Sequence, residues 1–375
     1  MKTVKLLVIV EIFLSILCGC TNKSNSKQAE EKVASRIECL SIDVTEDYIQ
    51  TYANSFCQST STRMEGKDCF IGYNQPLHCI DIINMTDRKP LKQVPLETQG
   101  PNGIPDVLGI CHYKNTFILK TSFGFCRIDD KGNILSKWML GDFLEKNAKG
   151  YSIIVPGSQV IVMSGYSFLF FDENEGIVAL PIYKKEKTGG ERITKKILLL
   201  SCTDWSTVDL INIPYPEYLQ KRENYDMLES INVLPHGNWV IYNFPASSEV
   251  FVYDRTSKNT QSYDIPSSYA KPIYEGDITS GFYGPLVYDV CRNTFWRVQE
   301  RPFSSGSAAF GKPFSISQIS SDFELLGEYS ILEEEFPGLI DKSPIFTDEA
   351  VLFTYNGGEY IGLNNMSFYG LKLKD

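Results

Sequence analysis

The sequence predicts an all-β fold, and the architecture that suits it best is a six-bladed β-propeller. Helical periodicity is scarce after the first 20 residues, whereas short runs rich in aromatic and β-branched residues recur along the rest of the 375-residue chain. Asp, Asn or Gly stands between these runs, as expected of turns between strands. The runs extend from residue 43 to residue 372, which is longer than a sandwich or a small barrel needs. Radial repetition of four-stranded sheets accommodates that length.

The first element is an export signal over residues 1–19. Lys2 and Lys5 precede the mostly apolar stretch 6–17, which is shorter than the ~20 residues that a membrane-spanning helix needs. The stretch ends in Leu-Cys-Gly-Cys at residues 17–20, which resembles the lipobox of bacterial lipoproteins. That resemblance implies cleavage before Cys20 and lipidation of its thiol. An ordinary cleaved signal peptide is the alternative.

Residues 20–36 are predicted to be a flexible tether, because Ser, Asn, Lys, Gln and Glu dominate and offer little to bury. Thr21 stands where Asp would favour retention in the inner membrane, and no acidic run of the kind that directs surface export follows Cys20. We therefore expect a lipid anchor in the outer membrane with the domain facing the periplasm. Surface exposure stays open.

The domain 37–375 divides into six units, each built from strand-like runs such as Val250-Phe251-Val252-Tyr253 that end at a turn residue such as Asp254. The units are 43–99, 104–141, 151–217, 225–268, 275–333 and 338–372, about 55 residues each. Their predicted strands are 68–73, 77–83 and 91–96; 108–113, 116–121, 125–129 and 134–140; 167–171, 177–183, 197–202 and 208–213; 231–234, 239–244, 250–254 and 261–265; 286–290, 295–299, 314–320 and 325–331; 345–347, 351–355, 360–363 and 368–373. Ring closure would place strand 37–44 beside the last unit. Seven blades of about 47 residues each are the alternative.

Charge and cysteine content narrow the class of protein. With 36 Lys and Arg against 46 Asp and Glu, the net charge is −10, and no basic block suggests nucleic-acid binding.

Eight of the ten cysteines remain once Cys18, which is predicted to be lost with the signal, and Cys20, which is predicted to be lipidated, are set aside, and no CxxC pair is present. We expect most of them to be reduced and buried as small apolar side chains. Cys69 and Cys79, on neighbouring strands of one predicted hairpin, are the best candidates for a disulfide.

The segment 94–103, Val-Pro-Leu-Glu-Thr-Gln-Gly-Pro-Asn-Gly, carries the most specific family signal. Together with the lipobox, the polar tether and the blade pattern, it resembles TolB-like six-bladed β-propeller lipoproteins of Bacteroidetes, in which a Leu-Glu-x-x-Gly-Pro segment often closes the first blade. The resemblance covers roughly residues 37–372. It implies a fold and a cellular address but no reaction, since most such proteins have no assigned activity.

Motifs for catalysis are absent from the sequence. The three histidines, His78, His112 and His236, have no partner at metal-ligand spacing, and there is no GxSxG, P-loop or Rossmann fingerprint. We therefore predict neither a metal nor a cofactor. A Ser-His-Asp triad assembled from separate blades stays open.

Topology gives a better indication of the site than motifs do. The loops that lead from the outer strand of one blade to the inner strand of the next gather on one face, and binding residues often lie on such loops. Here these loops are 100–106, 215–224, 271–277 and 334–341. Their candidate binding residues are Asn102, Asp106, Tyr218, Tyr274, Glu275 and Asp277.

Aromatic side chains beside carboxylates would suit a sugar, a peptide or a basic partner. The sequence thus predicts a lipid-anchored binding module of the cell envelope with a protein, peptide or other ligand. The alternatives are a hydrolase or lyase acting on a glycan or peptide, with acid–base residues at the channel mouth, and a purely structural envelope protein.

Overall fold

The structure is a computed structural model, and it describes residues 31–33, 37–43, 59–75, 77–153, 169–187, 191–213, 231–268, 270, 272, 282–300, 314–331, 339–340, 344–356 and 365–371. All of them belong to the unit Glu31–Asp375. The predicted signal peptide, Cys20 and the first part of the tether lie outside the described residues. No helix within the described residues is long and apolar enough to cross a bilayer.

The described strands form six sheets, which are the six blades of a β-propeller, as predicted. Blade 1 comprises β3 (Ser59–Met64), β4 (Lys67–Asn74), β5 (Cys79–Asn84) and β6 (Lys89–Pro95). Blade 2 comprises β7 (Gly109–Tyr113), β8 (Thr116–Thr121), β9 (Gly124–Ile128) and β10 (Ile134–Met139). Blade 3 comprises β11 (Ser152–Ile153) and β12 (Phe170–Asp172), both paired with β13 (Ile177–Lys187), then β14 (Glu191–Ser201) and β15 (Thr207–Ile213).

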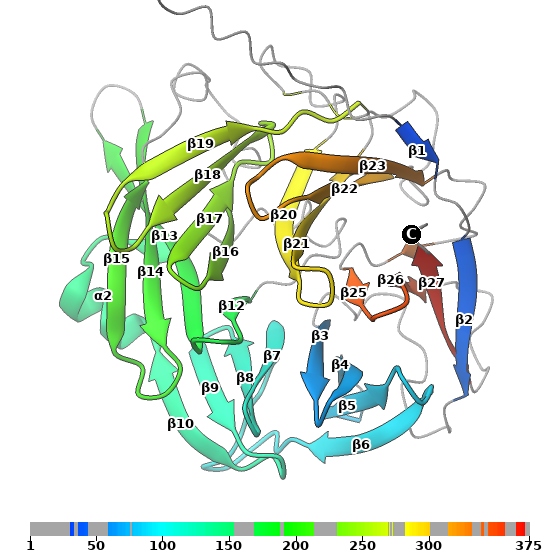
Figure 1. Cartoon of the computed structure of the whole chain (residues 1–375). Coiled ribbons are helices and arrows are strands. Elements are labelled where there is room, and N and C mark those ends of the chain that lie inside the picture. The colour runs from blue at the N-terminus through cyan, green and yellow to red at the C-terminus, as the bar shows by residue number, and fades with distance from the viewer. Residues whose placement is uncertain are drawn as a thin grey trace, which may run out of the picture. The chain divides into compact units, whose positions relative to one another are not determined.

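The remaining three blades follow the same plan. Blade 4 comprises β16 (Asn232–His236), β17 (Trp239–Asn243), β18 (Glu249–Asp254) and β19 (Thr260–Asp264). Blade 5 comprises β20 (Phe282–Asp289), β21 (Thr294–Glu300), β22 (Phe314–Ile319) and β23 (Leu325–Ile331), with β1 (Glu31–Val33) added in parallel to β23. Blade 6 comprises β24 (Leu339–Ile340) and β25 (Ile345–Phe346), both paired with β26 (Val351–Asn356), then β27 (Asn365–Leu371) and β2 (Ile37–Asp43). Figure 1 shows the six sheets around a common centre, with β3, β7, β12, β16, β20 and β25 innermost.

The ring is closed by a strand from the other end of the chain. β2 pairs antiparallel with β27 over seven residues, from Ile37 opposite Leu371 to Asp43 opposite Asn365. The predicted position of strand 37–44 beside the last blade is therefore confirmed. This pairing joins an early strand of the domain to its last described strand by backbone hydrogen bonds, so β2 forms the outer edge of the sixth blade.

The hydrophobic core is divided among the spaces between blades. Blades 1 and 2 share a cluster that includes Ile71, Ile80 and Ile110, and blades 2 and 3 share one that includes Phe125 and Leu198. Similar clusters join the later blades. Because each sheet buries side chains on both faces, its strands read as nearly continuous apolar runs, and this is the pattern that the sequence showed.

Aromatic residues fill these spaces as expected. Trp138, Trp205 and Trp296 are buried, and Trp239 is half-buried against Phe323. Large rings supply much of the contact area between sheets that lie face to face.

Several details differ from the sequence-based expectations or extend them. Residues 31–33, predicted to belong to a flexible tether, form the strand β1 and pair with β23. The helix α2 (Leu140–Asn147), which follows β10 and packs on Trp138 through Phe143, was not predicted. The strand β3 was not predicted either, because its sequence Ser-Thr-Ser-Thr-Arg-Met is polar. Cys69 and Cys79 are both free, since they lie opposite Asn84 and Asn74 at the two ends of one hairpin, too far apart for a disulfide. The predicted strand 360–363 lies outside the described residues.

Candidate functional site

A cavity of about 210 Å³ occupies the centre of the ring. The innermost strand of every blade contributes to its wall: Thr62 from β3, Ile110 from β7, Phe171 from β12, Val233 from β16, Leu286 from β20 and Ile345 from β25. The volume is far above the ~10–15 Å³ that one water needs, so a small molecule can enter.

The cavity has apolar walls and a polar end. Isoleucine, leucine, valine, proline and phenylalanine side chains dominate the inner strands other than β3, which contributes Thr60 to Arg63. Glu173 and Asn174 stand in the turn that follows β12. Inner strands run in the same direction in all blades, so this polar end lies where the inner strands finish. Apolar walls with a few placed polar groups are typical of small-molecule sites.

Asp172 holds the turn that presents Glu173. Its Oδ1 accepts hydrogen bonds from the backbone N–H groups of Asn174 (2.9 Å) and Glu175 (3.2 Å), and its Oδ2 accepts one from the backbone N–H of Gly237 in blade 4 (2.5 Å). This is an Asx turn, a local structure that Asp forms readily at the end of a strand. The buried Asp172 carboxylate is therefore satisfied by the backbone and leaves Glu173 to face the cavity.

Glu173 reaches across the channel from blade 3 to blade 1. Its Oε2 accepts a hydrogen bond of 3.2 Å from the hydroxyl of Thr62 on β3. The side chain is exposed, yet it faces a channel that all six blades line. The resulting desolvation, with a smaller contribution from the negative charge of Asp172, raises the pKa of Glu173 to about 7.

His236 and Tyr288 form an aromatic part of the wall between blades 4 and 5. Their ring centroids lie 4.1 Å apart, and the His236 ring also packs edge-on against Phe295. Burial lowers the pKa of His236 below its usual value of 6.5, and the charge of Asp172 opposes this only in part. The imidazole is therefore mostly neutral at pH 7.

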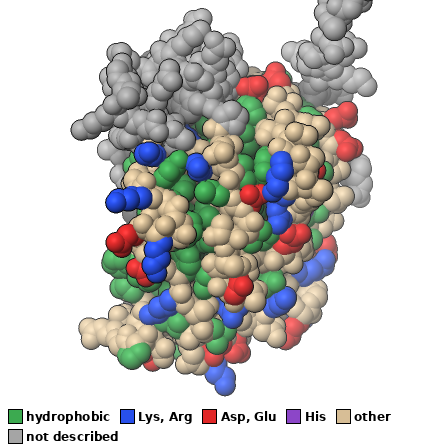
Figure 2. Space-filling model, turned by 90° about the vertical axis from the view of Figure 1, so that its left-hand side faces the viewer, with side chains coloured by type: hydrophobic (Ala, Val, Ile, Leu, Met, Phe, Trp, Pro, Cys, Tyr) green, Lys and Arg blue, Asp and Glu red, His purple; other side chains and the backbone are tan. Residues whose placement is uncertain are grey.

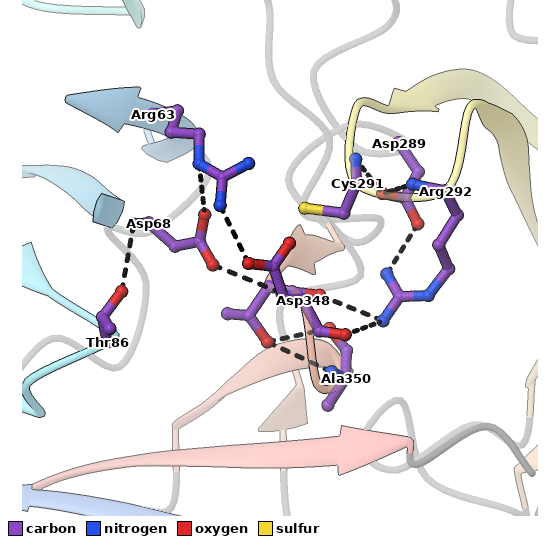
Figure 3. A network of polar contacts seen from close by, with 9 residues as sticks. Arg63, Asp68, Thr86, Asp289, Cys291, Arg292, Asp348 and Ala350 are labelled. Atoms are coloured by element: carbon purple, nitrogen blue, oxygen red, sulfur yellow. Dashed lines mark hydrogen bonds and ion pairs between the residues drawn. The ribbon is translucent and has the colours of Figure 1, made fainter. Parts of the chain in front are cut away.

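A polar network joins blades 1, 5 and 6 beside the cavity. Arg63 lies between Asp68 (3.5 Å) and Asp348 (2.8 Å), and Arg292 donates to Asp289 (2.8 Å) and to the carbonyl of Thr347 (3.0 Å). Figure 3 shows these groups converging from the ends of three blades. Charges of both signs are paired here, so the network connects blades and leaves neither guanidinium group without an acidic partner.

The same network contains a geometric arrangement that resembles a metal site. One ligand atom from each of Asp68, Cys291 and Asp348 lies within 4.8 Å of the others. Arg63 already pairs with both carboxylates, however, and burial together with nearby carboxylates raises the pKa of the Cys291 thiol to about 12. Two carboxylates that already share a guanidinium group, beside a thiol that is protonated at neutral pH, make a poor ligand set for a cation.

The sequence-predicted binding residues lie elsewhere or outside the described residues. Tyr218, Tyr274, Glu275 and Asp277 fall outside them. Asn102 and Asp106 lie in the segment between β6 and β7, as predicted, and neither lines the cavity. This segment leads into an inner strand, so it lies at the opposite end of the ring from Glu173. A binding role for these six residues remains a prediction.

Asp106 has a structural role in its loop. Its Oδ2 accepts hydrogen bonds from both the backbone N–H and the hydroxyl of Ser122, in the turn between β8 and β9 of blade 2. Its other oxygen, Oδ1, is buried without a partner among the described residues. The contacts tie the connection between blades 1 and 2 to the second blade.

Sequence reasoning missed the residues that the cavity brings together. Glu173 belongs to the acidic stretch Asp-Glu-Asn-Glu at residues 172–175, between the predicted strands 167–171 and 177–183, and Thr62 belongs to the unpredicted strand β3. The sequence feature that could have pointed to Glu173 is the position of this turn directly after an inner strand. That signal becomes useful only once the blade boundaries are known.

Figure 2 shows the flank of the ring rather than the channel. Lys and Arg side chains are interspersed there with Asp, Glu and apolar side chains, and no single charge dominates this face. A surface of this kind gives no electrostatic indication of a partner.

Comparisons with known proteins establish the family. The profile of DUF4221, a domain of unknown function, matches residues 33–330. The chain belongs to the DUF4221 family. A crystal structure of a DUF4221 member from Bacteroides vulgatus is similar at a TM-score of 0.66 and 19% identity, covering 91% of this chain and 99% of that one.

A second solved structure, of a candidate exported protein from Bacteroides fragilis, is similar at a TM-score of 0.52 and 9% identity, covering 92% of this chain and 98% of that one. At these identities the likeness shows the propeller fold alone. A search of curated proteins finds no match.

Proposed function

We propose that this DUF4221 protein is a lipid-anchored binding module of the cell envelope, which takes a small ligand in the channel of its propeller. The observation that carries the proposal is the cavity of about 210 Å³, to which all six blades contribute and whose polar groups gather at one end. A closed ring holds such a cavity open, because no single strand can collapse into it without disturbing its neighbours.

The test for channel binding compares two substitutions that add similar bulk in different places. Val233→Phe fills the cavity, whereas Val208→Phe adds the ring at an exposed position at the start of β15. In a thermal-shift screen of envelope metabolites, we expect at least one compound to stabilise the wild type and Val208→Phe but not Val233→Phe. If no compound stabilises the wild type, or if every stabilising compound acts equally on Val233→Phe, the channel is not the binding site.

Lipid anchoring and location belong to the same proposal. The Leu-Cys-Gly-Cys ending at residues 17–20 and the polar tether support attachment of the protein through Cys20. We propose that the lipid lies in the outer membrane and that the propeller faces the periplasm. Two or three acyl chains would hold the protein firmly. We expect Cys20→Ser to move the protein from the membrane fraction to the soluble fraction, and unchanged fractionation would contradict lipidation.

The link to TolB-like propeller lipoproteins is likewise part of the proposal. It is supported by the segment 94–103 and by the repeated blade pattern. A protein or peptide partner in the envelope, bound through the loops around the ring, is compatible with a channel ligand.

One specific observation favours the alternative that the protein is an enzyme. Glu173, with a pKa of about 7, shares the cavity with His236, and a carboxyl group that titrates near neutrality can act as a general acid or base. If the protein is a hydrolase or lyase, a panel of 4-nitrophenyl glycosides and peptide anilides would include a substrate whose turnover Glu173→Gln abolishes.

A further inference from the structure

We propose that the ligand of the channel cavity is a small organic ammonium ion on an apolar body, and that the Glu173 carboxylate is its counter-ion. This inference rests on the proposed function and specifies its ligand class. It follows from the charge, the walls and the geometry of the cavity.

The first step concerns charge. Within the described part of the chain, Glu173 has no ion pair, and the hydroxyl of Thr62 is its hydrogen-bond donor. Its neighbour Glu175 is different, because it points away from the cavity and pairs with Arg255 at 2.8 Å. Among the described residues, Glu173 is thus a carboxylate without a cationic partner, and it lines the cavity.

The other carboxylates at this end of the ring are already satisfied. Asp68 and Asp348 share Arg63, and Asp172 accepts three backbone N–H groups. A cation that enters the cavity therefore finds one carboxylate that gains an ionic partner without losing an existing one. Among the described residues that line the cavity, the guanidinium group is that of Arg63, which is already paired, so an anion gains no free guanidinium there and meets repulsion from Glu173.

The walls of the cavity determine the chemistry of the ligand body to which the ammonium group is attached. Much of the wall is apolar: Ile110, Leu169 and Val233 line the cavity together with the rings of Phe171 and Phe346. The polar remainder comes mainly from β3, which contributes Thr60 to Arg63, and from the residues beside Glu173. A short alkyl or aromatic body would bury apolar surface against these groups, and aromatic rings also attract a nearby cation.

The oxygen atoms available beside Glu173 do not suit a metal ion. Glu173 and the Thr62 hydroxyl supply oxygen atoms from two side chains, whereas Ca²⁺ takes six to eight oxygen ligands and Mg²⁺ demands near-octahedral geometry. An ammonium group needs only three acceptors, and it can share them with water.

Ligand affinity should depend on pH through Glu173. The other titratable groups that line the cavity are Arg63 on β3, Asp68 on β4, Cys111 on β7, Asp172 on β12, His236 on β16 and Tyr288 on β20. Burial raises the pKa of the Cys111 thiol and the Tyr288 hydroxyl and lowers that of His236, so these three remain neutral between pH 7 and pH 8. Ionisation of Glu173 should therefore dominate the pH dependence in this range, and ammonium affinity should rise from pH 7 to pH 8.

The experiment uses the full mature chain with labelled isoleucine methyl groups and three probes of similar shape: n-butylammonium, 1-butanol and butanoate. Methyl NMR titrations report binding at Ile110 and Ile345, which line the cavity. We expect butylammonium to bind at least about tenfold more tightly than butanol at pH 8, and butanoate to bind more weakly than butanol. Glu173→Gln should remove the preference for the ammonium ion, whereas the matched control Glu175→Gln should retain it.

The outcomes separate this inference from the proposed function. Equal binding of all three probes at the channel methyl groups, or a preference that survives Glu173→Gln, overturns the ammonium inference and leaves channel binding intact. Absence of any shift with butylammonium also overturns the inference. Channel binding itself is decided by the comparison of Val233→Phe with Val208→Phe. If Glu173→Gln fails to fold, the rise in ammonium affinity of the wild type from pH 7 to pH 8 gives an independent test, and a flat profile overturns the inference.

Discussion

Glu173 illustrates how one residue acquires unusual chemistry from its surroundings. The Asx turn of Asp172 fixes the backbone on one side, and the hydroxyl of Thr62 holds the carboxylate from the opposite side of the channel. Desolvation then raises its pKa from 4.5 to about 7. None of these effects requires a rare residue or a motif, which is why the sequence alone did not identify Glu173.

The raised pKa of Glu173 makes a prediction about stability. Between pH 4.5 and pH 7 the folded protein holds the Glu173 proton more tightly than the unfolded chain does, so this carboxyl destabilises the fold increasingly as pH rises through that window. Glu173→Gln removes the penalty and keeps an acceptor for Thr62. We therefore expect the melting temperature of Glu173→Gln, relative to wild type, to be more favourable at pH 8 than at pH 5.

Calorimetry at the two pH values measures this difference. Glu175→Gln is the control, since its exposed carboxylate pairs with Arg255 outside the cavity. A melting-temperature difference for Glu173→Gln that does not change with pH would contradict the raised pKa.

At the scale of a single structural element, the turn between β12 and β13 depends on a glycine. Gly176 has φ of +68°, and a Cβ atom at this position would lie 2.5 Å from Cζ of Tyr113 in blade 2. Side chains are strained in this backbone region, and the contact leaves no room for one. The turn that presents Glu173 is therefore held by close packing against the neighbouring blade.

Gly176→Ala should accordingly destabilise the protein by about 2 kcal/mol or more, the sum of backbone strain and overpacking. Gly66→Ala is a matched control, because Gly66 has φ of +78° but no atom within 4 Å of the added Cβ. We expect that control to show only the strain, about 1 kcal/mol. Equal losses in chemical denaturation would mean that the contact with Tyr113 does not matter.

At the same scale, a strand could be predicted from the sequence when it packs between two sheets and was missed when it lines the channel. Strands such as β17 and β18, which are packed between sheets, appear in the sequence as apolar runs and were predicted to within about a residue of their observed bounds. The strand β3 lines the cavity instead of packing between two sheets, and its sequence is polar, so it carried no strand signal. Only the pairing with β4 shows that it is a strand.

At the scale of the whole molecule, the number of blades and the closure of the ring could be predicted, whereas the site could not. Repeated runs of similar spacing predict six sheets, and an unassigned early strand suggests closure with the last sheet. The cavity combines residues from six blades that are far apart in the chain, so no local pattern marks it. Asn102 and Asp106 were placed correctly between blades 1 and 2, but they lie at the end of the ring opposite Glu173.

Closure of the ring should be important for stability. Removal of residues 31–43 deletes β1 and β2, which leaves the edge of β27 without its antiparallel partner. We expect this truncated chain to melt at least about 5 °C below a chain that begins at residue 31, and to aggregate more readily. Thermal unfolding followed by circular dichroism measures the difference, and equal melting temperatures would show that β2 does not secure the ring.

The central claim is that the channel of the propeller is a binding site whose charge is Glu173. The most direct measurement is a crystal structure of the protein with n-butylammonium bound. The nitrogen should lie within about 2.7–3.2 Å of a Glu173 carboxylate oxygen, with the alkyl chain against the apolar wall near Ile110 and Val233. A channel that holds only water at saturating butylammonium, or a ligand seated instead near Asn102 and Asp106, would contradict the claim.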